Sequence, residues 1–90
     1  MSKSLESEQH LIACAIIDEN RATDLLDLPE SWFSLNAHKL ILRTIRELVS
    51  ASLSADLFSI GDSLSRNKLL ISAGGMEYLS ELAESLPNLG

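Results

Sequence analysis

The chain of 90 residues has little cysteine, proline or aromatic character: it holds one Cys, two Pro, one Trp, one Tyr and two Phe. A single thiol, Cys14, excludes an intramolecular disulfide. The longest apolar run, residues 11–17, is far shorter than the roughly 20 residues that span a bilayer. Glu6 and Glu8 stand where a secretory signal would be apolar. We therefore expect a cytoplasmic protein with no membrane contact.

Basic residues are also scarce. Seven Lys and Arg stand against thirteen Asp and Glu, which gives a formal net charge of −6. Affinity for nucleic acid comes largely from neutralising phosphates with basic side chains, so an acidic chain argues against DNA or RNA as the main ligand. The same reasoning argues against an anionic membrane surface.

What the chain does have is an ordinary globular composition, with 46% hydrophobic and 22% charged residues. Such a composition disfavours disorder over most of the length. The length suits one domain, so we expect residues 1–90 to form a single helical domain with frayed ends at residues 1–4 and 87–90. No strand signal, repeat or low-complexity tract is present.

Apolar periodicity predicts five short helices, at about residues 4–17, 20–27, 37–50, 59–67 and 72–84. The predicted N-caps are Ser4, Asn20, Asn36, Ser59 and Ser72, and the predicted stops are Pro29 and Pro87. Among the side chains expected to be buried are Leu26 in the second helix and Met76 in the last. Gly74 and Gly75 fall in the first turn of the last helix. Each glycine costs about 1 kcal/mol there, and we expect the close approach of another backbone in return.

The segment 37–50 is the most amphipathic. One face carries Ala37, Ile41, Leu42, Ile45, Leu48 and Val49. The opposite face carries Lys39, Arg43 and Arg46, which are the candidate partner-contact residues. One interpretation is a solvated face on which Arg43 pairs with Glu47 at i, i+4. The other is an electrostatic contact with an acidic neighbour, such as a second copy of the chain.

No catalytic, cofactor or metal site is expected. Gly74-Gly75 lacks the following Lys and Ser/Thr of a nucleotide-binding loop. His10 and His38 fall on different predicted helices without a visible third metal ligand. Cys14 reads as a small buried side chain with no base beside it. Acid pairs such as Glu6 and Glu8 suit capping and solubility better than proton transfer.

A set of landmarks in a fixed order is the most specific pattern in the chain. Its members are Glu8, Gln9, Phe33, His38, Ile41, Asp56, Leu64, Gly74, Gly75, Tyr78 and Leu79, followed by Pro87. In order and spacing they resemble the N-terminal domain of the DnaB-type replicative DNA helicase family over nearly the whole chain. Ala13-Cys14 departs from a frequent glycine of that family, and Ala37 from a frequent proline. Both changes favour helix.

The resemblance implies an all-α, compact orthogonal bundle of about five to six short helices. It implies a fragment without enzymatic activity, since ATP, magnesium and DNA would be bound by a motor domain absent from this chain. In the family, such domains form a collar on a hexameric ring and dock primase and, in some systems, a helicase loader. Spare apolar residues such as Leu11 and Leu40 also predict weak self-association of the isolated chain, as a dimer at high concentration.

Two other classes of function remain open from the residues alone. A freestanding helix-turn-helix regulator is permitted by the helix lengths but opposed by the acidic balance. An enzyme subunit would need a pocket with converging polar groups, and no motif in the sequence predicts such a pocket.

Overall fold

The computed structural model describes residues 5–84, and every regular element in that range is helical. The order is α1 (Leu5–Ile17), α2 (Glu19–Asp24), the 3-10 turns η1 (Leu25–Asp27) and η2 (Glu30–Trp32), α3 (Asn36–Ser50), α4 (Leu57–Arg66) and α5 (Gly75–Glu84). The all-α class is therefore confirmed. The expected cap Ser4, the stop Pro87 and the two frayed ends lie outside the described residues. Within residues 5–84 no helix has the length and apolar character needed to cross a membrane.

Two helices begin earlier than predicted because an aspartate caps each of them. The Asp18 carboxylate accepts the amide of Asn20 at 2.9 Å, so α2 starts at Glu19. The Asp56 carboxylate accepts the amide of Ser59 at 2.7 Å, so α4 starts at Leu57. The predicted caps Asn20 and Ser59 are wrong. A carboxylate satisfies a free helical N–H and also meets the positive end of the helix dipole, which favours it as a cap.

The last helix begins later than predicted, at Gly75, and Ser72 is not its cap. The reason lies in the backbone of Gly74 and Gly75, which have φ of +104° and +78°. Such angles do not occur inside a right-handed helix, so Gly74 lies before α5 and Gly75 is its first residue, and only glycine adopts these angles at little cost. Residues 70–74 form turns instead, closed by the Gly75 amide on the Leu70 carbonyl at 2.8 Å.

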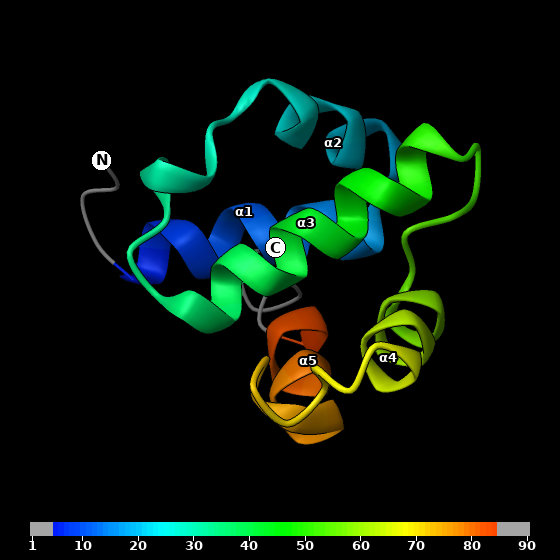
Figure 1. Ribbon diagram of the computed structural model, residues 1–90. Helices are drawn as coiled ribbons and strands as arrows, with labels where there is room; N and C mark the ends of the chain where they lie inside the picture. The colour runs from blue at the N-terminus through cyan, green and yellow to red at the C-terminus, as the bar shows by residue number, and fades with distance from the viewer. Residues whose placement is uncertain (1–4, 85–90) are drawn as a thin grey trace.

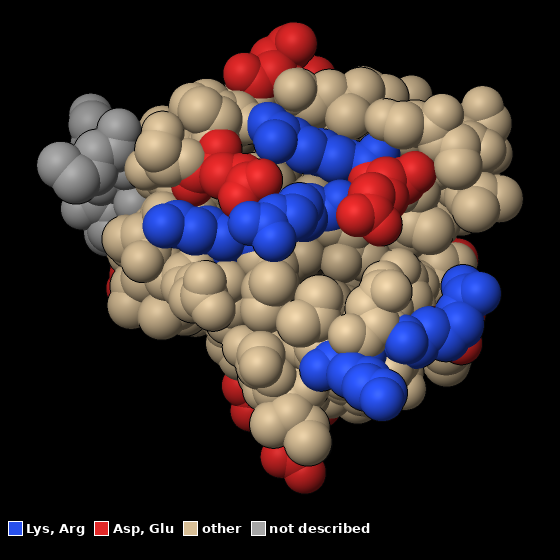
Figure 2. Space-filling model, viewed as in Figure 1, with Lys and Arg blue, Asp and Glu red and all other residues tan. Residues whose placement is uncertain are grey.

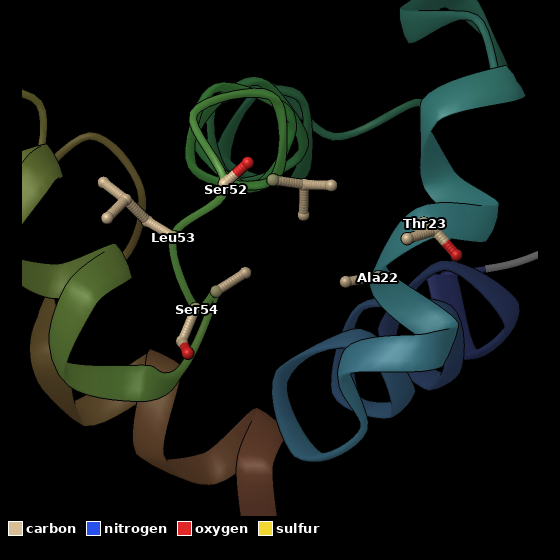
Figure 3. Close-up of a pocket in the computed structure, with 7 residues that line it drawn as sticks. Ala22, Thr23, Ser52, Leu53 and Ser54 are labelled. Carbon is tan, nitrogen blue, oxygen red and sulfur yellow. The ribbon is translucent and has the colours of Figure 1, made fainter.

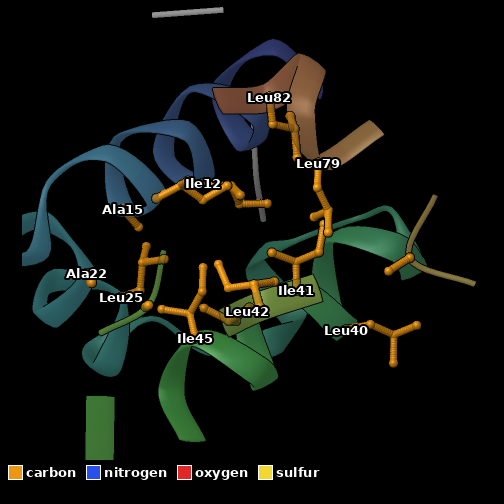
Figure 4. Close-up of a cluster of buried hydrophobic side chains, with 14 of the residues drawn as sticks. Ile12, Ala15, Ala22, Leu25, Leu40, Ile41, Leu42, Ile45, Leu79 and Leu82 are labelled. Carbon is orange, nitrogen blue, oxygen red and sulfur yellow. The ribbon is translucent and has the colours of Figure 1, made fainter. Parts of the chain in front are cut away.

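Helices α1 and α3 cross the middle of the domain, with α2 on one side of them and α4 and α5 on the other (Figure 1). Helix α1 packs on α2, α3 and α5, and α3 packs on α2 and α4. Their inner faces supply the core around Ile12, Ile41, Leu42 and Ile45, which Leu79 of α5 completes (Figure 4). The predicted apolar face of α3 is therefore largely the buried one.

Three side chains depart from the predicted burial. Leu40, expected to be spare, is buried in the core. Leu26 and Met76, expected to be buried, are exposed. Leu26 lies in the 3-10 turn η1, whose tighter winding takes it off the α2 face. Met76 extends over Gly61, where an added Cβ would stand 2.4 Å from its sulfur.

Candidate functional site

A buried polar cluster joins three helices that are far apart in the sequence. His38 Nδ1 of α3 lies 2.8 Å from Glu8 Oε1 of α1, and both side chains are fully buried. The other ring nitrogen of His38 contacts the hydroxyl of Tyr78 in α5. Gln9 Nε2 donates to that hydroxyl at 3.2 Å. With Nδ1 donating to the carboxylate and the tyrosine hydroxyl donating to Nε2, every partner in this Glu8–His38–Tyr78 cluster is satisfied.

The second carboxylate oxygen of Glu8 serves the start of α3. It accepts the Ser34 amide at 3.0 Å and the Ser34 hydroxyl at 2.7 Å. The cap position of α3, Leu35, has no side chain that can accept a hydrogen bond, and the predicted cap Asn36 is already the first helical residue. A carboxylate from α1 thus lies at the positive end of the α3 dipole. Glu8 was expected to serve capping and solubility; the solubility role is wrong because its side chain is buried, and the helix start that it satisfies is that of α3.

Gly74 makes room for the tyrosine of this cluster. A Cβ at Gly74 would lie 2.6–2.8 Å from the Cδ2, Cβ and Cγ atoms of Tyr78. The close neighbour is therefore a side chain and not the second backbone that we expected. The tyrosine ring stacks on the His38 ring, with centroids 5.8 Å apart and planes 11° from parallel. Nothing lies within 4 Å of a Cβ at Gly75, whose role is the positive φ alone.

The other landmark residues have packing or capping roles. Ile41, Leu64 and Leu79 are buried in the core. Phe33 is buried beneath Trp32, whose ring meets it edge-on with centroids 5.0 Å apart. Asp56, already described, caps α4. These landmarks therefore have structural roles, and the polar atoms of Glu8, Gln9, His38 and Tyr78 face one another.

The candidate partner-contact residues form a partly exposed, mixed-charge patch, which we call the α3 patch: Lys39, Arg43 and Arg46 with Glu30. The guanidinium of Arg43 binds both oxygens of Glu30, at 2.8 and 3.1 Å. The predicted pair of Arg43 with Glu47 is wrong, because η2 brings a carboxylate into the fork geometry that arginine prefers. Arg46 Nε reaches the Leu25 carbonyl at 3.4 Å. Figure 2 shows blue and red side chains interleaved across this side of the molecule.

All three basic side chains of the α3 patch affect the pKa of Glu30. The hydrogen bond from Arg43 is the largest cause that lowers the pKa of Glu30 from 4.5, and partial burial opposes it. The positive charges of Arg43, Arg46 and Lys39 lower that pKa further. In return, the Glu30 carboxylate raises the pKa of Arg43. Three cations therefore act on Glu30, and the charge of Glu47 also raises the pKa of Arg43, so positive and negative groups alternate at the α3 patch.

Two of the pockets on the described part of the surface bear on possible binding. The first, of about 230 Å³, lies between α2 and the connection from α3 to α4 and has no charged lining (Figure 3). The second, of about 330 Å³, lies between α1 and the segment α2–η1, and we call it the α1–α2 pocket. Its lining residues are His10, Leu11, Cys14, Arg21, Asp24, Leu25 and Leu28.

Cys14 is half-buried at the α1–α2 pocket, with its sulfur 3.6 Å from His10 Nε2. We expected a buried thiol with no base beside it, and that expectation is wrong. The i, i+4 spacing of the two residues on one helix could have shown the pair. Among residues 5–84 no three His, Cys, Asp or Glu side chains come together as a metal site would require.

The comparisons with known proteins agree with this architecture. The structure superposes on the crystal structure of the N-terminal domain of DnaB helicase from Mycobacterium tuberculosis with a TM-score of 0.88 and 27% identity, over 93% of this chain and 59% of that chain. The fold is thus that of a helicase N-terminal domain. The family model described as DnaB-like helicase N terminal domain matches residues 1–89, and the chain belongs to that family.

Its relatives include two proteins named replicative DNA helicase DnaB. The protein of Buchnera aphidicola subsp. Baizongia pistaciae is 29% identical over 90 residues, which cover 98% of this chain. That of Geobacillus stearothermophilus is 28% identical over 88 residues, which cover 94% of this chain. The chain spans 19% of the length of each of these relatives.

Proposed function

We propose that the chain is a non-catalytic assembly and docking domain of a replicative DNA helicase in the cytoplasm. It would support the collar of a hexamer and dock primase or a helicase loader, while ATP and DNA would be bound by a motor domain. The support is family membership together with the distribution of polar groups. Glu8, His38 and Tyr78 bind one another inside the fold, so the charged side chains available to a partner are those outside, such as the α3 patch.

The α3 patch suits an acidic partner. It gathers three of the seven basic side chains of a chain whose formal net charge is −6, with Glu30 and Glu47 close to Arg43. The side chain of Arg43 remains 56% exposed while it holds Glu30. An approaching carboxylate can therefore use the same cations without breaking the fold. Complementary charge of this kind guides encounter and orientation more than it adds affinity.

The test compares two single charge reversals in a full-length helicase that contains this domain. Lys39→Glu changes the α3 patch, and Lys68→Glu is the matched control because it makes the same change at an exposed lysine beyond the end of α4. We expect Lys39→Glu to weaken primase binding severalfold at low salt, with a smaller difference at high salt, where exposed charges are screened. Lys68→Glu should leave binding unchanged. Equal effects of the two reversals would remove the α3 patch from the proposal.

A second variant checks that the α3 patch is a surface and not part of the fold. Arg43→Glu with Arg46→Glu replaces the attraction of Glu30 by repulsion and removes the contact of Arg46 with the Leu25 carbonyl, but substitutes no buried residue. We expect the helical circular dichroism of the wild type and a modest fall in melting temperature. Loss of the cooperative unfolding transition would show that this face supports the core.

A further inference from the structure

Helix α4 presents an aromatic ring to solvent beside a pair of opposite charges. Phe58 is 79% exposed. Asp62 and Arg66 follow at one-turn intervals and form an ion pair of 2.9 Å, with their side chains 66% and 74% exposed. Residues four apart lie on the same side of a helix, so the three make one exposed stripe, which we call the α4 stripe. None of the three belongs to the hydrophobic core. The chain has only four aromatic side chains, and leaving one of them exposed gives up the stabilisation that its burial would contribute.

The α1–α2 pocket has complementary features. Leu11, Leu25 and Leu28 give it an apolar lining, and Arg21 and Asp24 stand three residues apart at its edge. Both charged residues are exposed. Its volume of about 330 Å³ lies in the range of roughly 300–1,000 Å³ that is typical of pockets for organic ligands, which is enough for one aromatic ring.

We propose that the α4 stripe of one copy docks in the α1–α2 pocket of a second copy of this chain. The Phe58 ring enters the apolar lining, Asp62 meets Arg21, and Arg66 meets Asp24. The α4 stripe and the pocket edge each carry one cation and one carboxylate about a helical turn apart. In the docked pair each cation therefore faces a carboxylate of the other copy, and no charge is left unpaired. A buried aromatic anchor with a charged edge is the common composition of a protein interface. This inference rests on the proposed assembly function.

The two surfaces lie on different parts of the domain, because α2 is on one side of the central helices and α4 is on the other (Figure 1). A copy that has inserted its Phe58 therefore still offers a free pocket. Such a contact is heterologous: it extends from copy to copy, closing a ring when the rotation allows. This arrangement differs from a two-fold contact in a way that mixing experiments detect.

The first experiment measures self-association of the chain by sedimentation up to millimolar concentration. We expect Phe58→Ser to weaken association about tenfold or more, as loss of a central anchor does. Ile71→Ser is the matched control, because Ile71 is 91% exposed and belongs to neither surface. Wild-type chain that stays monomeric, or equal association of the two variants, would overturn the proposal.

The second experiment uses Cys14, the one cysteine of the chain, as a handle in the pocket. A phenylmaleimide attached to its sulfur fills the pocket while Phe58 stays free. The blocked chain and the Phe58→Ser chain should each be monomeric alone and should form a one-to-one dimer when mixed, because only one complementary pair of surfaces remains. Failure of the mixture to combine contradicts a heterologous contact.

A third measurement does not depend on how the blocked chain folds. Raising the concentration of wild-type chain should slow the maleimide reaction of Cys14, since docking covers the thiol, and Phe58→Ser should remove that protection. A reaction rate independent of concentration in the wild type would contradict the proposal. These outcomes are separate from the primase experiment, because Lys39 lies in neither docking surface. Loss of the α4 contact would leave the docking of primase untouched.

Discussion

Replacing Glu8 by glutamine tests whether the buried cluster sets the stability of the domain. The carboxylate accepts two hydrogen bonds from Ser34 and one from His38, of 2.7–3.0 Å, and a longer one of 3.5 Å from the Leu35 amide, and its side chain has no contact with solvent. Glutamine keeps the shape but offers one oxygen and one NH₂ group. The NH₂ group must face either the Ser34 amide, which is a donor, or His38, which must then turn its own proton toward Tyr78.

The expected cost follows from the charge and the geometry. Hydrogen bonds to an ionised group contribute about 1.5–3 kcal/mol and neutral ones about 0.5–1.5 kcal/mol, and an unsatisfied buried group costs about 1–3 kcal/mol. We therefore expect Glu8→Gln to lower the free energy of unfolding by about 2 kcal/mol. A domain of this size has roughly 5–13 kcal/mol in total. The melting temperature should fall by about 8–16 °C, since each kcal/mol shifts it by about 4–8 °C in a domain of 60–100 residues.

Thermal and urea unfolding followed by circular dichroism measure this loss, and Glu6→Gln is the matched control. Glu6 is exposed in the same first turn of α1, so its change removes only a charge near the helix N-terminus, about 0.5 kcal/mol. Tyr78→Phe in the Glu8→Gln background should cost less than in the wild type, because both changes act on the same cluster. Equal melting temperatures for Glu8→Gln and Glu6→Gln would refute the structural role of the cluster.

Two further predictions concern the ion pair and the glycines. The Arg43 hydrogen bond holds the pKa of Glu30 below 4.5. This ion pair therefore stabilises the fold above pH 4.5, and its contribution is lost as the pH falls through the lowered pKa. Arg43→Gln should return the pKa of Glu30, measured by NMR titration, toward 4.5 and should remove the loss of stability that protonation of Glu30 causes in the wild type. Gly75→Ala should cost about 1–2 kcal/mol for its positive φ, whereas Gly74→Ala should cost clearly more in urea unfolding, because its Cβ also collides with Tyr78; equal losses would contradict the close contact.

The sequence predicted the apolar framework well, because a buried helix face repeats with a period that is visible locally. Ile41, Leu42 and Ile45 were assigned to the core from spacing alone, and all three are fully buried. Helix ends were harder to predict. The predicted caps Asn20 and Ser59 lie two and three residues after the observed caps Asp18 and Asp56. Only the backbone geometry shows which side chain accepts the hydrogen bond from the first turn of the helix. Local pattern identifies a helix better than its first residue.

The polar interior could not be derived from the local pattern. Glu8 has the neighbours of an ordinary first-turn carboxylate, and its partners Ser34 and His38 lie 26 and 30 residues away. Tyr78 lies 40 residues beyond His38. Hydrophobic periodicity carries no information on such pairs, since each member looks like a surface residue on its own helix. The ion pair of Arg43 with Glu30 was missed for the same reason, because a 3-10 turn supplies the carboxylate.

The placement of the landmark residues bears on where partner specificity resides. Glu8, His38 and Tyr78 bind one another, Phe33 and Ile41 pack in the core, and Gly74 accommodates the tyrosine ring. Residues used in this way build the fold, and their polar groups have little left to offer a second protein. We propose that a partner instead contacts exposed side chains outside this set, such as Lys39 in the α3 patch and Phe58 in the α4 stripe. If so, the single substitutions Lys39→Glu and Phe58→Ser should change binding with little effect on the melting temperature, because neither residue belongs to the core.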